Sequence, residues 1–120
     1  MARPNEKPVS IVEVEPFKRV VSSVLTEDEL EEFKYFIASH PESGDLIRGT
    51  GGVRKVRWAP KGIGKSGGVR IIYYFHDLDM PLFLITAYKK SRKVSLTKQQ
   101  RNQMSTLVDL LVQHYSGERQ

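Results

Sequence analysis

The sequence predicts an α+β fold, a small and mostly antiparallel β-sheet with helices packed on one face. Three short runs rich in β-branched and aromatic residues follow one another in the middle of the chain, separated by turn-forming residues. Capping boxes at Thr26 and Thr97 begin apolar-periodic segments on either side of these runs. At 120 residues, without an internal repeat, the chain is expected to form a single domain over residues 1–120.

The first elements are short. Residues 1–8 are polar with two prolines, and we expect a loose leader there. The alternating segment SIVEVE, residues 10–15, predicts a first strand with Ile11 on one side and Val12 and Val14 on the other. Pro16 then opens a short helical segment, FKRVVSSVL.

A longer helix follows from Thr26, which has Glu29 three residues later as its capping-box partner. Its apolar positions are Leu30, Phe33, Phe36 and Ile37. The helix should stop near His40, because a residue that precedes proline is disfavoured in the α region. A polar turn, ESGD, comes next.

The sheet is expected from three strands, VRKVRWA, VRIIYYF and LFLITAYKK, joined as an antiparallel meander. Thr97 with Gln100 forms the second capping box. The helix after it should end at Gly117 and carry one apolar face, formed by Met104, Leu107, Val108, Leu111 and Tyr115.

Composition excludes several kinds of chemistry. The chain has no cysteine, so thiol chemistry, disulfides and cysteine-ligated metals are excluded. Its three histidines stand far apart without metal-ligand spacing, so we expect no metal site and no cofactor. No apolar run is long enough to span a membrane and no signal-peptide core is present, so a cytoplasmic location is expected.

Charge is concentrated in the middle of the chain. Residues 48–93 contain eleven Lys and Arg against two acidic residues, a net charge of +9, while the remainder carries −4. A centre this positive in an otherwise acidic chain predicts a site for a polyanion. The alternative is an ordinary solvated face of a basic protein.

The segment GIGKSGGVR, residues 62–70, contains the GKS that ends a nucleotide-binding loop but does not complete that motif. The first glycine of the motif would fall at Ala59, and a strand follows the segment where a P-loop requires a helix. We interpret it as a flexible basic connection between two strands and not as a site for ATP.

Alternation along the strands gathers cations on one face of the sheet. Lys55 and Arg57 share a face of their strand, Arg70 begins the next strand, and Tyr88 and Lys90 share a face of the last. No acidic residue is expected to neutralise this face. Like charges on neighbouring strands are destabilising, and an anionic partner would remove that cost.

The same residues carry a family resemblance. The runs DLIRGTGGVRKVRWA, GGVRIIYYF and LFLITAYKK, followed by a helix, resemble the RelE/HigB toxins of bacterial toxin–antitoxin pairs. The resemblance extends from about Asp28 to the end of the last helix, and IRGTGGVRK joined to GKSGGVRIIYYF is typical of the HigB-like branch. It implies the RelE-like microbial RNase fold.

The resemblance also implies a function, that of a ribosome-dependent, metal-independent endoribonuclease that cleaves mRNA in the ribosomal A site. Its implied partners are the ribosome, mRNA and a cognate antitoxin, of the helix-turn-helix HigA type. The family's catalytic cations fall on Lys55, Arg57, Arg70 and Lys90. Further RNA contacts are expected from Arg54, Lys61, Lys65, Tyr88, Lys89 and Arg92.

One family feature is missing. The better-known relatives place a tyrosine where this chain has Leu96, and Tyr88 is the nearest aromatic residue that could stack on a base. Two alternatives remain open, a ParE-like relative that inhibits DNA gyrase without cleaving RNA and a non-catalytic RNA- or ribosome-binding protein. The ParE branch usually lacks the basic set on the sheet.

Overall fold

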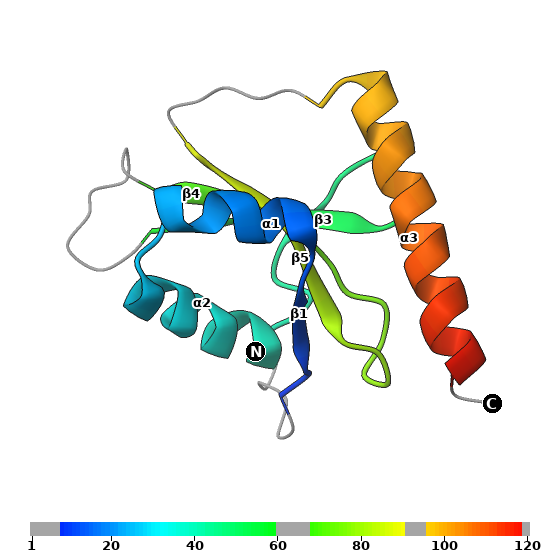
Figure 1. The fold of residues 1–120 in the computed structure, drawn as a ribbon, viewed down its shortest axis with the longest axis horizontal. Coiled ribbons are helices and arrows are strands. Elements are labelled where there is room, and N and C mark those ends of the chain that lie inside the picture. Colours follow the sequence, from blue (N-terminus) through cyan, green and yellow to red (C-terminus); the bar gives the residue numbers. More distant parts are fainter. Residues whose placement is uncertain (1–7, 60–67, 91–95, 119–120) are drawn as a thin grey trace.

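The computed structural model describes residues 8–59, 68–90 and 96–118 and confirms the α+β class (Figure 1). Its elements, in chain order, are β1 (Ile11–Glu13), α1 (Glu15–Val20), the 3-10 turn η1 (Val21–Ser23), α2 (Glu27–Ser39), β2 (Asp45–Leu46), β3 (Val53–Trp58), β4 (Val69–Tyr74), β5 (Leu82–Lys89) and α3 (Lys98–Glu118).

Both predicted capping boxes are formed. At the start of α2, the Thr26 side chain accepts from the Glu29 backbone N–H and the Glu29 carboxylate accepts from the Thr26 N–H. Thr97 and Gln100 make the same two bonds at the start of α3. Each box satisfies backbone donors that the first helical turn leaves without partners. The helix α2 ends at the predicted position, with His40 as its C-cap.

The five strands form one sheet in the order β1-β5-β4-β3-β2. The predicted meander is confirmed, because β3, β4 and β5 pair antiparallel. Two features go beyond the prediction. The first strand is shorter than expected and pairs with β5 in parallel, and the two-residue strand β2 adds an edge beside β3.

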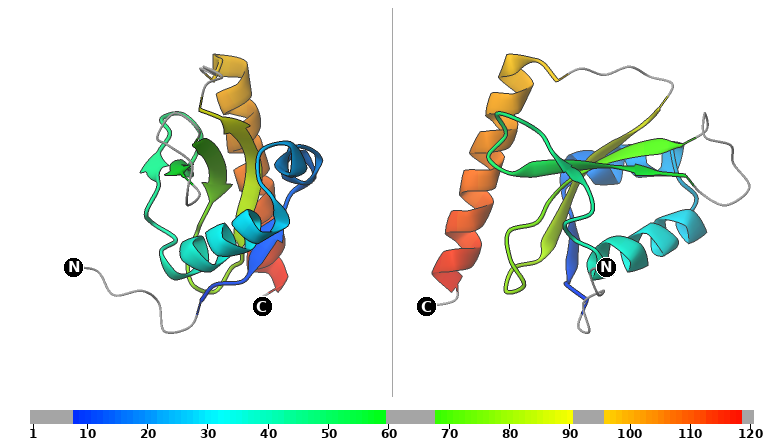
Figure 2. Two further views of the ribbon diagram at one scale, coloured as in Figure 1. Left: turned by 90° about the vertical axis from the view of Figure 1, so that its left-hand side faces the viewer. Right: turned by 180° about the vertical axis from the view of Figure 1, so that it is seen from behind.

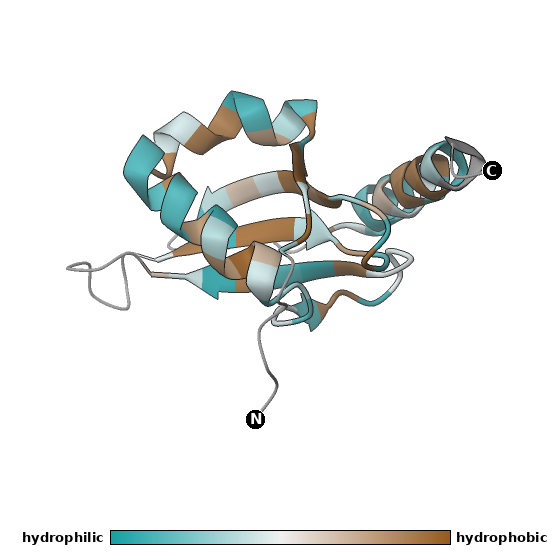
Figure 3. Cartoon of the chain, turned by 90° about the horizontal axis from the view of Figure 1, so that it is seen from below, coloured by the Kyte–Doolittle hydropathy of each residue, from teal (hydrophilic) through white to brown (hydrophobic). Residues whose placement is uncertain are grey.

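Helices cover the sheet unequally. The helices α1 and α2 pack on one face of the sheet (Figure 3). On that face Phe17, Phe33 and Ile37 join Ile71 and Tyr73 in a fully buried core. The predicted packing on a single face therefore holds for these two helices. In contrast, α3 packs against a second apolar cluster on the opposite face and stands apart from α1 and α2 (Figure 2).

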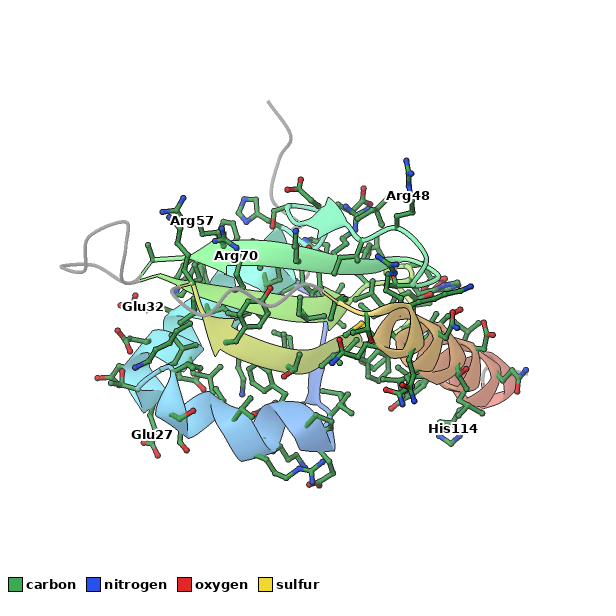
Figure 4. All side chains as sticks on the ribbon, turned by 90° about the horizontal axis from the view of Figure 1, so that it is seen from above. Glu27, Glu32, Arg48, Arg57, Arg70 and His114 are labelled. Carbon is green, nitrogen blue, oxygen red and sulfur yellow. The ribbon has the colours of Figure 1, made fainter. Side chains whose placement is uncertain are left out.

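The apolar side of α3 consists of the predicted residues. Val108 is buried in the second cluster with Val53, Tyr74 and Phe83, and the other predicted positions pack against this cluster, namely Met104, Leu107, Leu111 and Tyr115. These strand residues lie toward one end of the sheet. The helix therefore does not cover the opposite end of this face, around Arg57 and Arg70, which is left open as far as the described residues are concerned (Figure 4).

An irregularity in β5 sets which of its side chains share this open face. Ile72 pairs with Thr86 and Tyr73 pairs with Leu84, so Ile85 is an extra residue in β5. Such a bulge shifts the alternation of side chains by one. As a result, Phe83 under α3 and Tyr88 at the open end both lie on the α3 side of the sheet, although their positions differ by an odd number.

Candidate nucleic-acid interface

The open part of the sheet carries two rows of side chains across three strands. Arg57, Arg70 and Tyr88 lie opposite one another on β3, β4 and β5. Lys55, Ile72 and Thr86 form the neighbouring row. Directly opposed residues of antiparallel strands point to the same face with Cβ atoms about 5 Å apart. The structure therefore brings Lys55, Arg57, Arg70 and Tyr88 together, as their alternation predicted.

Lys90 continues this arrangement one residue after the end of β5. Its backbone N–H donates to the Gly68 carbonyl at 2.9 Å, which extends the ladder between β4 and β5. Because Lys90 lies two residues after Tyr88, alternation places it on the same side. We refer to these five residues, Lys55, Arg57, Arg70, Tyr88 and Lys90, as the cationic face.

The members of the cationic face differ in exposure. Lys55 and Arg57 are exposed, whereas Arg70 and Tyr88 are half-buried. The Nη1 atom of Arg70 is buried, and no described atom accepts a hydrogen bond from it. A buried donor without an acceptor costs free energy, and an anion bound at the face could supply that acceptor.

Tyr88 combines a fixed ring with a partly accessible surface. Its ring packs against the apolar cluster under α3, which contains Ile72. A ring that is held from one side and accessible from the other can serve as a stacking platform for a base.

Two residues expected to bind RNA do not lie on the cationic face. Arg54 points to the opposite face, and its Nη1 donates to the carbonyl oxygens of Gly44 at 2.7 Å and Glu42 at 3.2 Å. Its guanidinium therefore stabilises a turn. Lys89 also points to the opposite face, because its partner in β4 is Val69, a member of the α1–α2 core. Both residues lie in the strands where they were predicted, but alternation separates them from Lys55 and Tyr88.

The expectation that no acidic residue lies on this face was wrong. Asp45 on β2 stands directly opposite Lys55 and shares its face, and both side chains are exposed. The sequence could not indicate this carboxylate, because a two-residue strand has too few positions to show alternation. The placement of Asp45 depends on the pairing of β2 with β3.

Other expected residues lie outside the described part of the chain. These are Lys61, Lys65 and Arg92. In the turn before β3, Arg48 is exposed (Figure 4). The side chain of Arg101 from α3 lies against the adjacent Gly49. Arg101 adds a cation near Arg48 that the sequence pattern did not single out.

Two buried tyrosines have perturbed hydroxyls. Burial raises the pKa of Tyr73 above its ordinary value of 10.0, outweighing the lowering by the Gly44 hydrogen bond and the Arg54 charge. Burial also raises the pKa of Tyr74, with smaller contributions from the negative charges of Asp77 and Asp109. Both tyrosines are structural, since Tyr73 lies in the α1–α2 core and Tyr74 under α3.

Within the described ranges, no three His, Asp or Glu side chains are grouped so that they could hold a metal ion. None of the helices in those ranges has the length and apolarity needed to cross a membrane. Compared with models of known protein families, the chain matches none.

Proposed function

We propose that this protein is a toxin of a toxin–antitoxin pair and acts in the cytoplasm as a ribosome-dependent mRNA endonuclease. The observation that carries the proposal is the row Arg57–Arg70–Tyr88, which sets two guanidiniums beside an aromatic ring on an open sheet surface. Guanidinium groups bind phosphate in a bidentate manner, and an adjacent ring can stack on a base.

The reaction is transesterification within the RNA. The 2′-OH attacks the adjacent 3′-phosphate, the bond from phosphorus to the 5′-oxygen of the next nucleotide breaks, and a 2′,3′-cyclic phosphate and a 5′-OH result. Hydrolysis of the cyclic phosphate by one water molecule then gives a 3′-phosphate. This step requires alignment of the 2′-oxygen, stabilisation of the charge on the transition state, and proton transfer.

The cationic face offers a group for most of these tasks. Arg57 and Arg70 hold the scissile phosphate, and the unsatisfied Nη1 of Arg70 supports its assignment to that role. Lys90 stabilises the leaving 5′-oxygen and supplies its proton. Lys55, in the neighbouring row, is assigned the role of proton acceptor, and Tyr88 stacks on a neighbouring base.

Dependence on the ribosome follows from the kind of groups present. The cationic face supplies phosphate contacts but few groups that read base edges. Free RNA would therefore bind without its 2′-oxygen being aligned with the scissile phosphate. A ribosome that presents an unpaired codon in a fixed conformation would supply that alignment. The proposed protein regulator of this activity is a cognate antitoxin of the helix-turn-helix type.

The test compares programmed ribosomes with free RNA. Purified protein should cleave mRNA on the ribosome and leave the same RNA intact in solution, and Arg70→Ala should abolish cleavage. Cleavage should continue at EDTA concentrations that leave the ribosome assembled. Equal cleavage of both RNAs would overturn ribosome dependence.

Induction in bacteria separates the alternatives. Growth arrest with fragmented mRNA supports the proposal, whereas growth arrest with intact mRNA and altered DNA supercoiling would indicate a ParE-like gyrase inhibitor. Ribosome binding without growth arrest would indicate a non-catalytic binding protein.

A further inference from the structure

Asp45 is the one acidic residue that strand pairing places beside the described residues of the cationic face. Its Cα partner is Lys55, so the two side chains project from neighbouring strands with Cβ atoms about 5 Å apart. The next residue of β3 on this face is Arg57. A phosphate held by Arg57 would therefore lie within side-chain reach of both Lys55 and Asp45.

The turn that precedes Asp45 is held firmly. The buried Tyr73 hydroxyl donates to the Pro41 carbonyl at 2.8 Å and accepts from the Gly44 N–H at 2.9 Å. Arg54 donates to the Gly44 carbonyl from its own strand. A strand of only two residues would fray without such support, so these bonds fix the backbone immediately before Asp45.

Gly44 lets this turn approach closely. A Cβ atom at position 44 would lie 2.8 Å from the Lys55 carbonyl oxygen and 2.8 Å from the Tyr73 ring. Both neighbours are backbone or buried ring atoms that have little freedom to move. Only glycine allows β2 to lie this close to Lys55, which is what brings Asp45 to the edge of the cationic face.

A carboxylate at this position opposes phosphate binding, because its charge repels the substrate. It nevertheless suits proton transfer, since carboxylates are ionised at neutral pH and accept protons, whereas lysines in water carry theirs. We propose that Asp45 is a catalytic residue that accepts the proton of the attacking 2′-OH. This inference rests on the proposed endonuclease function and moves the role of proton acceptor from Lys55 to Asp45.

The step is balanced as follows. The 2′-OH proton moves to a carboxylate oxygen of Asp45 while the 2′-oxygen forms its bond to phosphorus. The bond from phosphorus to the 5′-oxygen breaks with its electron pair on that oxygen, which takes a proton from the Lys90 ammonium. Lys55 keeps its proton and stabilises the negative charge on the phosphoryl oxygens.

The experiment uses the full chain on programmed ribosomes and measures single-turnover cleavage at saturating protein across pH. The variants are Asp45→Asn, Asp45→Glu and the control Asp28→Asn, which makes the same change at an exposed position on α2. Asp45→Asn should bind ribosomes at least as tightly as the unmodified chain, because it removes a negative charge. Its cleavage rate should fall by about 10²–10⁴-fold.

Two readouts distinguish proton transfer from a structural role. The unmodified chain should lose activity toward acidic pH as its acceptor becomes protonated, and Asp45→Asn should lack this acidic limb. Asp45→Glu should recover part of the rate because it restores the carboxylate, and Asp28→Asn should match the unmodified chain.

The failure of this inference differs from failure of the proposed function. If the unmodified chain cleaves and Asp45→Asn cleaves at the same rate with the same pH profile, Asp45 is not the acceptor and the endonuclease proposal stands. If the unmodified chain cleaves no mRNA on ribosomes, both proposals are overturned.

Discussion

Arg57 and Arg70 lie directly opposite each other on β3 and β4, so two guanidinium groups share one patch at the open end of the sheet (Figure 4). Opposed like charges in a sheet are destabilising by a few tenths to about 1 kcal/mol. Arg70 also buries its Nη1 atom without an acceptor among the described residues. Both features lower the stability of the folded protein, as expected at a site where an anion binds.

This relationship predicts opposite effects on stability and activity. Arg70→Met should raise the free energy of unfolding by about 1 kcal/mol, because it removes both the like-charge repulsion and the buried unpaired donor. It should also lower single-turnover cleavage by about 10²–10³-fold. Chemical denaturation and ribosome cleavage assays measure the two quantities. Arg48→Met, at an exposed position beyond the far end of β3, is the control and should change neither.

Arg54 should affect stability and not RNA affinity. Arg54→Ala removes two hydrogen bonds to carbonyl oxygens of the 42–44 turn and should lower the free energy of unfolding by about 1–2 kcal/mol. The salt dependence of ribosome binding should stay the same, whereas Arg57→Ala should reduce the slope of log K against log salt by about 1. A reduced slope for Arg54→Ala would contradict its assignment to the turn.

Tyr88 should act through its ring. Tyr88→Phe should keep most of the activity, because the stacking surface is preserved. Tyr88→Leu should weaken transition-state binding by about 1–3 kcal/mol, the usual contribution of stacking on one base. The comparison of kcat/KM for the two variants on programmed ribosomes tests this, and equal losses would assign the role to the hydroxyl instead.

The lysines between β3 and β4 should contribute to docking. Replacing Lys61 and Lys65 with alanine should weaken ribosome binding and lower the salt slope by about 1 for each phosphate that the variant no longer binds. Single-turnover cleavage at saturating protein should change little, whereas Lys55→Ala should slow cleavage and leave binding nearly unchanged. A double variant that binds normally but cannot cleave would make this segment part of the active site.

Buried tyrosines predict a loss of stability in alkali. The raised pKa of Tyr73 means that the folded protein holds this proton at a pH where the unfolded chain has released it. The stabilisation is therefore complete below about pH 10 and is lost as pH rises through the folded-state pKa. Denaturation measured across the alkaline range should show this decline, with a smaller slope for Tyr73→Phe.

The same variant should be less stable at neutral pH by about 1–3 kcal/mol, because the Gly44 N–H loses its buried acceptor and the Pro41 carbonyl loses its donor. Tyr35→Phe, at a position 78% exposed on α2, is the control and should match the unmodified chain at neutral and alkaline pH. An identical alkaline decline in Tyr73→Phe would exclude Tyr73 as its source.

The sequence by itself determined the features that depend on neighbouring residues. The Thr26 and Thr97 capping boxes, the end of α2 before Pro41 and the apolar side of α3 follow from local hydrogen bonding and helical period, and all are present. Alternation along β3 was equally local, so it correctly placed Lys55 and Arg57 on one face.

Tertiary structure decided the features that depend on how separate segments meet. The bulge at Ile85 brings Phe83 and Tyr88 to the same face, and no sequence pattern marks that extra residue. The closeness of Asp45 to Lys55 arises from Gly44, Tyr73 and Arg54, which come from three different segments of the chain. Local patterns encode the period of a strand, but the register between strands is set by packing and by hydrogen bonds formed across the whole sheet.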